Sequence, residues 1–435
     1  MTYRPSVTLN AHPVCGMHTP PLTRLLCLLA LIAFHGSAWA EWPQFRGPTG
    51  QGHSDATTVP LQWGPEKNVV WKQSLPGLGW SSPVVSGNRI YVTTAVSDSP
   101  NASGTLSLRL LCLDATAGQT LWNREVFQAD GSSLKRSHRK NSQASPTPIL
   151  EDDRIYVHFG HMGTACLDNA GNLLWRQSEL DYSPVHGNGG SPILVENLLV
   201  FSADGSEDPF VAALDKRTGH VAWRTTRTEP DASKKFSFGT PLLIETDGHR
   251  QIISQGSEMV GAYDPKTGRE LWKVRYDGYS VVPRPVFGHG LIFISTGFDR
   301  PVVLAIRPGG SGDVTDTHVV WTLGKGGPKT PSLLLVGDEL FMVSDGGIAS
   351  CVDARTGRVH WEERVGGNYS ASPLYAAGRI YLQSEEGKGV VLRAGTRFEV
   401  LAGNELEERS LASYGLTDKG ILIRTEHRLY LVGAP

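Results

Sequence analysis

A phrase made of an aspartate, a short glycine turn and a tryptophan recurs along this chain. Five copies run Cys112–Trp122, Cys166–Trp175, Ala213–Trp223, Ala262–Trp272 and Cys351–Trp361. The tryptophans Trp122, Trp175, Trp223, Trp272, Trp321 and Trp361 lie 53, 48, 49, 49 and 40 residues apart. A period of this length, with β-rich runs between turn residues, is typical of a β-propeller.

Each repeat opens with a Ser/Thr-Pro step or a variant of it, followed by alternating, β-branched runs that predict strands. The eight steps are Ser82-Pro83, Ser145-Pro146, Ser191-Pro192, Thr240-Pro241, Arg284-Pro285, Thr330-Pro331, Ser372-Pro373 and Ser413-Tyr414. The eighth repeat ends near Leu429–Val432 without a fourth strand, and Val69–Lys72 near the start matches the missing one, tryptophan included. We therefore predict an all-β fold, an eight-bladed propeller of four-stranded blades, closed by pairing of the N- and C-terminal strands.

The repeated aspartates and tryptophans have structural roles in this prediction. An aspartate before a D-x-x-T-G turn accepts backbone hydrogen bonds, and the glycine takes the positive φ that the turn needs. A tryptophan ring fills space between neighbouring blades. Three cysteines outside the first 40 residues, Cys112, Cys166 and Cys351, share one repeat position and are expected to be small buried residues rather than disulfide partners.

Residues 1–40 are expected to be a signal peptide with an upstream extension. An apolar run, Leu25–Phe34, follows Arg24 and precedes an A-x-A cleavage motif that ends at Ala40. Translation starts at Met1 or at Met17, and cleavage after Ala40 would send the chain to the periplasm or outside the cell. Residues 41–62 would lead into the ring, and residues 63–435 would form a single propeller domain.

Bulk composition excludes several classes of protein. Charged residues make up 19% of the chain and its formal net charge is −2, so neither nucleic acid nor an anionic membrane is an expected partner. No segment after the leader is apolar enough to span a membrane. Glycine and proline are frequent, 49 and 27 residues, but they fall periodically in turns.

The A-x-D-x-x-T-G-x-x-x-W phrase resembles the tryptophan-docking repeat of the pyrroloquinoline quinone (PQQ) propeller family, over about residues 60–435. The stretch Glu41–Gly52 resembles the opening of secreted bacterial PQQ-binding-like repeat proteins. The resemblance implies either a PQQ- and calcium-dependent dehydrogenase or a non-catalytic relative of the propeller subunit of outer-membrane assembly. The chain lacks the vicinal Cys-Cys pair and the C-x-x-C-H haem motif of some of the dehydrogenases, and no motif places a calcium site. No cofactor and no metal ligand is therefore assigned, with PQQ and Ca²⁺ as the alternative.

Propeller ligands commonly bind at one mouth of the central channel, near the connections that enter the innermost strands. Those connections carry polar and aromatic groups in this chain. The candidate ligand-binding residues are His138, Arg139, Asn141, His186, Asn188, Arg284, Asn368 and Tyr369, with Arg136, Lys140, Tyr182 and Tyr279 beside them. The glycine-rich HGNGGSP connection, residues 186–192, allows close backbone approach and offers donors and acceptors.

The preferred hypothesis is an exported, non-catalytic propeller that acts as a monomeric binding or interaction scaffold, with a protein partner or a small ligand at the channel mouth. No catalytic residue is assigned. The first alternative is a PQQ- and calcium-dependent dehydrogenase of alcohols or sugars. The second is a propeller hydrolase or lyase that uses mouth residues such as His186.

Overall fold

The computed structural model describes residues 41–98, 104–130, 137–228 and 234–433. Every described residue lies in one compact unit. The predicted signal peptide, its cleavage site and Arg136 lie outside the described residues. No helix in the described ranges is long and apolar enough to cross a membrane.

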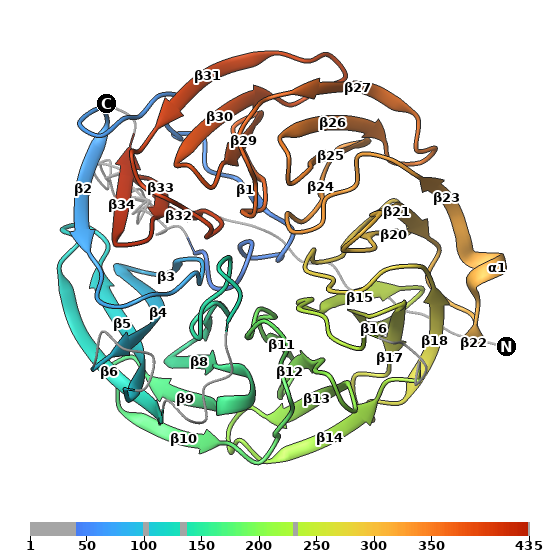
Figure 1. Ribbon diagram of the computed structural model, residues 1–435, viewed down its shortest axis with the longest axis horizontal. Helices are drawn as coiled ribbons and strands as arrows, with labels where there is room; N and C mark the ends of the chain where they lie inside the picture. Colours follow the sequence, from blue (N-terminus) through green and yellow to red (C-terminus); the bar gives the residue numbers. More distant parts are fainter. Residues whose placement is uncertain (1–40, 99–103, 131–136, 229–233, 434–435) are drawn as a thin grey trace, which may run out of the picture. The chain divides into compact units, whose positions relative to one another are not determined.

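Eight blades follow one another around a ring, and in each the strands run from the channel outward (Figure 1). Blade 1 has β3 (Val84–Ser86), β4 (Arg89–Ser97), β5 (Leu106–Asp114) and β6 (Thr120–Ala129). Blade 2 has β7 (Ile149–Glu151), β8 (Arg154–His158), β9 (Thr164–Asp168) and β10 (Leu173–Gln177). Blade 3 has β11 (Ile193–Val195), β12 (Leu198–Ala203), β13 (Phe210–Asp215) and β14 (Val221–Thr226). Blade 4 has β15 (Leu242–Thr246), β16 (His249–Gly256), β17 (Met259–Tyr263) and β18 (Glu270–Arg275).

The second half of the ring continues the pattern. Blade 5 has β19 (Val286–Gly288), β20 (Leu291–Ser295), β21 (Val303–Ile306) and β23 (Val319–Leu323). Blade 6 has β24 (Leu334–Val336), β25 (Glu339–Val343), β26 (Ile348–Asp353) and β27 (Val359–Arg364). Blade 7 has β28 (Leu374–Ala376), β29 (Arg379–Gln383), β30 (Lys388–Arg393) and β31 (Val400–Glu405). Blade 8 has β32 (Gly415–Thr417), β33 (Gly420–Arg424), β34 (Arg428–Gly433) and, from the start of the chain, β2 (Val69–Ser74).

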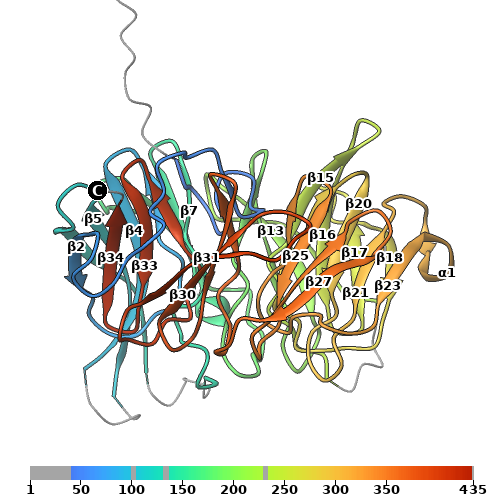
Figure 2. The same ribbon diagram turned by 90° about the horizontal axis from the view of Figure 1, so that it is seen from above.

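A few short elements lie outside this scheme. The strand β22 (Gly312–Asp313) adds to blade 4 and β1 (His53–Ser54) adds to blade 7, both in parallel pairing. One 3-10 turn, η1 (Gly160–Met162), and one short helix, α1 (Thr315–His318), lie in connections. Figure 2 views the propeller from the edge, with the strands running through its thickness.

The predicted closure is confirmed, because β2 pairs antiparallel with β34 and completes blade 8. Middle strands such as β12 are buried along their whole length because a blade packs on each face. Outer strands such as β14 are mostly exposed, with Trp223 buried between the exposed residues Ala222 and Arg224. The eight-bladed, all-β prediction therefore agrees with the structure.

Six tryptophans of the outer strands dock on the glycine turn of the next blade. Indole N–H groups donate to turn carbonyl oxygens in six pairs: Trp71 to Ala115, Trp122 to Asn169, Trp175 to Lys216, Trp223 to Pro265, Trp321 to Ala354 and Trp361 to Gly395. Trp272 differs and donates to Gln251 Oε1, because the turn that would receive it is lengthened over residues 307–318. The turn aspartates accept backbone hydrogen bonds as predicted; Asp353 Oδ1 accepts from the N–H groups of Arg355 and Thr356.

The three cysteines are buried free thiols, as predicted. Burial raises the pKa of the Cys112 and Cys351 thiols to about 12 and that of Cys166 to about 11. None of the three is therefore a reactive thiolate at neutral pH.

A belt of hydroxyl groups lines the channel where the innermost strands begin. Backbone N–H groups donate to the hydroxyl of the following blade in six pairs: Ser82 to Thr147, Thr147 to Ser191, Ser191 to Thr240, Arg284 to Ser332, Ser332 to Ser372 and Ser372 to Ser413, each at 2.9–3.0 Å. The belt corrects two predicted opening steps, because blades 2 and 6 use Thr147 and Ser332, two residues after Ser145 and Thr330. In blade 5 an arginine, Arg284, occupies the hydroxyl position, and its Nε donates to the Pro241 carbonyl oxygen.

The segment of residues 41–54 crosses the channel, and we call it the N-terminal plug. It contacts blades around the ring through its backbone. Trp42 exchanges both backbone hydrogen bonds with Val85 of blade 1, and Pro43 O accepts from Leu150 N of blade 2. On the opposite side, Phe45 O accepts from Arg284 Nη1 at the start of blade 5, and Gly52 O accepts from Tyr375 N of blade 7. The plug therefore ties together blades that are far apart in the ring.

Candidate functional site

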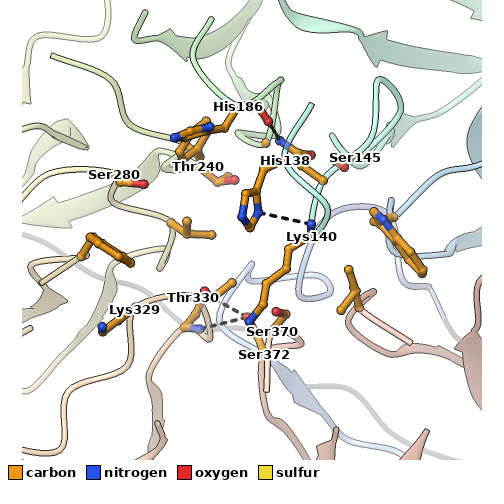
Figure 3. Close-up of a pocket in the computed structure, with 18 of the residues that line it drawn as sticks. His138, Lys140, Ser145, His186, Thr240, Ser280, Lys329, Thr330, Ser370 and Ser372 are labelled. Atoms are coloured by element: carbon orange, nitrogen blue, oxygen red, sulfur yellow. Dashed lines mark hydrogen bonds between the residues drawn. The ribbon is translucent and has the colours of Figure 1, made fainter. Parts of the chain in front are cut away.

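A cavity of about 750 Å³ opens at the mouth of the channel. Residues of all eight blades line it, including seven hydroxyls of the belt: Ser82, Thr147, Ser191, Thr240, Ser332, Ser372 and Ser413. Phe45 of the N-terminal plug also lines it. Figure 3 shows His138 and Lys140 projecting into the cavity between His186 and Thr240 on one side and Thr330 and Ser372 on the other. The mouth is therefore a cup assembled by the whole ring, with Phe45 among its lining groups.

One wall of the cup is a run of five rings, which we call the aromatic arc: His138, His186, Phe236, Tyr279 and Phe298. Successive ring centroids lie 5.6, 5.4, 5.7 and 5.7 Å apart along this order. These separations fall in the range of favourable edge-to-face contact. The arc gives the cup a continuous apolar, aromatic wall.

Two lysines lie against the arc. Lys234 Nζ is 3.9 Å from the centroid of the Tyr279 ring, and Lys329 Nζ is 4.6 Å from that of Phe298. A cation over an aromatic face is stabilised by the ring quadrupole, and this contact leaves ammonium N–H groups for a ligand. Arg139 and Lys140 bring two further cations to the lining.

The cup is poor in negative charge. Asp345 is the one carboxylate among its described lining residues. Its oxygens accept from the Lys329 and Thr330 backbone N–H groups and, at 2.7 Å, from the Thr330 hydroxyl. Nearby, Glu385 pairs with Lys140 at 2.6 Å. With Lys140 offset by Glu385, three cationic side chains remain against the one lining carboxylate and give the cup a positive potential.

Four predicted site residues line this cup: His138, Arg139, Asn141 and His186. The connections that carry them are joined, because His138 N and Asn141 Nδ2 both donate to the His186 carbonyl oxygen at 3.0 Å. Partial burial, followed by the nearby charges of His186, Arg139 and Lys140, lowers the pKa of His138. His138 is therefore neutral at pH 7.

Of the four predicted residues that do not line the cup, two turn into the protein, which corrects their predicted place. Asn188 is buried, donates to the Phe159 carbonyl oxygen and accepts from the Tyr182 hydroxyl, so its amide is used in holding two connections together. Tyr369 is buried in the core between blades 6 and 7, and burial raises the pKa of its phenol to about 12. Both positions precede an innermost strand, but their side chains turn into the protein.

The remaining two predicted residues lie at the margins of the cup. Arg284 is buried outside its lining and donates from Nη1 to the Phe45 carbonyl oxygen at 2.9 Å. Asn368 lies in a side pocket of about 370 Å³ with Arg139, Lys140, Glu385 and Arg409. Its amide donates to Glu386 at 2.7 Å.

Sequence reasoning missed Phe45, Trp80, Lys234, Phe236, Phe298, Lys329 and Asp345 as lining residues. Lys234, Phe236 and Lys329 lie on connections into blades 4 and 6, which the same search could have included. Phe298 and Asp345 lie between the second and third strands of their blades. In an antiparallel blade that loop emerges on the same face as the entry to the first strand. This topological rule would have found both residues.

The carboxylate set does not fit a calcium-bound quinone. Calcium takes six to eight oxygen ligands, several of them carboxylates. In the described ranges, no three His, Cys, Asp or Glu residues are grouped to hold a metal ion, and Asp345 already accepts three hydrogen bonds. The cationic wall is instead suited to an anion without a metal.

Two curated relatives share part of the chain. Tetrathionate hydrolase of Acidithiobacillus ferrooxidans is 20% identical over 63% of this chain and 51% of its own length. Quinohemoprotein alcohol dehydrogenase ADH IIB of Pseudomonas putida is 24% identical over 73% of this chain and 48% of its own length. The chain thus spans about half the length of the curated relatives it matches.

Among solved structures, BamB from Moraxella catarrhalis superposes with a TM-score of 0.57 and 12% identity, covering 83% of this chain and 96% of BamB. This likeness concerns the fold. A family model described as outer membrane protein assembly factor BamB matches residues 107–333 and 311–406, well over half of the chain. On this match, and on the repeat that builds the ring, the chain belongs to the BamB-like family of PQQ-repeat β-propellers.

Proposed function

We propose that this protein is an exported, non-catalytic binding propeller whose channel mouth holds a small anionic ligand with an apolar body. The observation that carries the proposal is the composition of the cup. Two lysines lie over the aromatic arc, and the one lining carboxylate, Asp345, already accepts three hydrogen bonds. A volume of about 750 Å³ lies within the range of small-molecule sites. The arc would cover the apolar body of the ligand, and Lys234 and Lys329 would bind its charge.

Catalysis is not part of the proposal because the described mouth lacks a nucleophile joined to a base. No hydrogen bond connects a lining hydroxyl to the imidazole of His138 or His186 in the described ranges. The belt hydroxyls instead accept backbone N–H groups of neighbouring blades. The oxygens of these hydroxyls therefore hold neighbouring blades together, and the same residues line the cavity.

The test is calorimetric titration of the purified protein with PQQ, with and without Ca²⁺, and with smaller probes: benzenesulfonate, phthalate and adipate, with benzyl alcohol as the uncharged reference. We expect saturable binding of an aromatic anion, independent of Ca²⁺, that Lys329→Met weakens about tenfold or more. Lys72→Met is the matched control, since Lys72 lies on the outer strand β2, away from the cup, and pairs there with Glu66. Absence of binding by every anion, or equal affinity in Lys329→Met, would rule the proposal out.

A hydrolase that acts on an anion is the second candidate. Two imidazoles in a cationic cup, His138 and His186 with ring centroids 5.6 Å apart, favour it, and one relative is named for the hydrolysis of tetrathionate. Incubation of the protein with tetrathionate, followed by sulfate and thiosulfate analysis, separates the candidates. Turnover lost in His186→Gln would favour the hydrolase over a binding protein.

A further inference from the structure

The N-terminal plug carries a buried arginine with unused donors. Arg46 is 2% exposed, although it belongs to a segment that crosses the channel. Its Nη2 donates to the carbonyl oxygens of Leu333, at 2.6 Å, and Gln51, at 3.0 Å. Its Nε and Nη1 are buried with no partner in the protein. A buried cation with orphan N–H groups is costly unless something accepts them.

A second buried arginine, Arg284, adds to the positive charge at the same place. Its Nε and Nη1 donate to the carbonyl oxygens of Pro241 and Phe45. Burial lowers the pKa of Arg284 to about 9, and burial together with the charge of Arg284 lowers that of Arg46 to about 9. Both guanidinium groups therefore keep their charge at neutral pH.

Glycines of the plug hold these two groups in place. A Cβ on Gly50 would lie 2.1 Å from Arg284 Nη1, and one on Gly52 would lie 2.8 Å from Arg46 Nη2. All hydrogen-bond partners of the two guanidiniums are carbonyl oxygens, which carry only partial charge. The site is therefore pre-organised, with a positive charge that the described protein leaves without a carboxylate counterion.

The same chain contains a buried arginine that is fully neutralised. Arg227, in blade 3, pairs with Asp204 through Nε at 2.6 Å and Nη2 at 2.9 Å. Its Nη1 and Nη2 also donate to groups of Ser254 and Gln255. Arg227 therefore has its own carboxylate inside the ring, whereas two donor atoms of Arg46, Nε and Nη1, remain without a partner.

We propose that Arg46 and Arg284 bind a small monovalent inorganic anion, of the size of chloride, behind the floor of the channel mouth. The anion would accept from Nε and Nη1 of Arg46 and offset one of the two buried positive charges. Because Arg46 belongs to the plug and Arg284 to blade 5, the bound anion would lock the plug into the ring. This site is separate from the cup and does not depend on the ligand proposed there.

Crystals of the protein grown in sodium bromide test the site directly by anomalous scattering. We expect a bromide peak in contact with Nε or Nη1 of Arg46. Thermal unfolding in sodium chloride and in sodium gluconate of equal ionic strength gives a second measurement, since gluconate is too large for a buried pocket between two side chains. Chloride at a hundred times its Kd raises the folding equilibrium constant about 100-fold.

Two variants control the thermal measurement. Arg46→Met should remove the difference between the two salts. Arg424→Met is the matched control. Arg424 is also buried without a carboxylate, but only its Nε lacks a partner, since its Nη1 and Nη2 donate to Ser81 and Thr93. This variant should lose stability and keep the chloride response. An anomalous peak at Arg46 establishes the site, even where Arg46→Met fails to fold. Saturating bromide without a peak there overturns the proposal.

Discussion

The indole N–H of Trp71 donates to the carbonyl oxygen of Ala115 over 3.1 Å, and its ring lies against Gly118, where an added Cβ would be 2.5 Å from Trp71 Cδ2. Trp71 comes from the strand that completes blade 8, and Gly118 lies in the turn of blade 1. The same docking joins neighbouring blades at five other junctions of the ring. At this junction it also links β2 to blade 1, while β2 itself pairs with β34 of blade 8.

Gly118→Ala should therefore destabilise the ring more than the loss of a positive-φ glycine alone. The methyl group would overlap the Trp71 ring, and overpacking of this kind costs on the order of 2 kcal/mol. Gly87→Ala is the matched control, because Gly87 also has positive φ, +55° against +73°, but has open space around its Cβ position. Urea unfolding of the three proteins measures the difference, and equal losses in the two variants would contradict the docking interpretation.

The buried pair Arg227–Asp204 predicts a large loss in Asp204→Asn. The carboxylate accepts two bonds from the guanidinium and one from the Ser237 hydroxyl, and both charged side chains are 2% exposed or less. Removal of one charge leaves the other buried and unpaired, at a cost of about 3–5 kcal/mol. Glu66→Gln, which breaks the exposed pair with Lys72, should cost less than about 1 kcal/mol. Chemical denaturation of both variants measures the two losses of unfolding free energy, and similar losses would refute the prediction.

His158 predicts how stability falls on acidification. Burial, and secondarily the charge of His161, lowers the pKa of His158 from 6.5 to about 3. Below pH 6.5 the unfolded state takes up a proton that the folded state refuses, so stability decreases as the pH falls from 6.5 towards 3. The slope from this group is up to about 1.4 kcal/mol per pH unit.

His158→Gln should flatten the acid limb of the stability curve between pH 6 and pH 4, with a separate constant loss from the contacts of the ring with Phe201 and Thr164. His220→Gln, at an exposed turn, is the control and should keep the wild-type slope. Asp168 and Asp353, whose pKa values are lowered by hydrogen bonds, add an acid loss common to all three proteins. An unchanged slope in His158→Gln would show that the buried imidazole does not govern this limb.

The propeller ring could be predicted from the sequence because the residues that build it recur in a local, repeated pattern. The aspartate, glycine and tryptophan of each turn interact within one or two blades, and the match of Val69–Lys72 to a missing strand predicted the closure. The N-terminal plug could not be predicted in this way. Arg46 is bonded to Leu333, 287 residues later, and no repeat or periodicity marks such a contact.

The candidate site was predicted in part for the same reason. The connections that enter the innermost strands recur once per repeat, so His138 and His186 could be predicted as residues of the channel mouth. The direction of a single side chain does not follow it, and Asn188 and Tyr369 turn inward although they hold equivalent positions. Arg284 was selected for its polarity, whereas its observed role is to replace a belt hydroxyl and contact the plug.

The cup predicts two distinguishable ways to weaken a bound aromatic anion. Phe45→Ala removes an apolar lining group while its backbone carbonyl stays available to Arg284. Loss of this burial should reduce affinity by about tenfold or somewhat more, by the same factor at every ionic strength. Lys329→Met removes a charge, so its effect should be largest in dilute salt and shrink as screening increases.

The two effects are separated by titrating wild type and both variants with benzenesulfonate at about 20, 150 and 500 mM salt. Over this range the Debye length falls from about 20 to about 4 Å. We expect the Phe45→Ala curve to run parallel to wild type and the Lys329→Met curve to converge on it at high salt. Parallel curves for both variants would mean that Lys329 acts through packing on Phe298 and not through charge. Because the two side chains belong to the plug and to blade 6, weaker binding of the same anion in both variants would also place both groups in a single site.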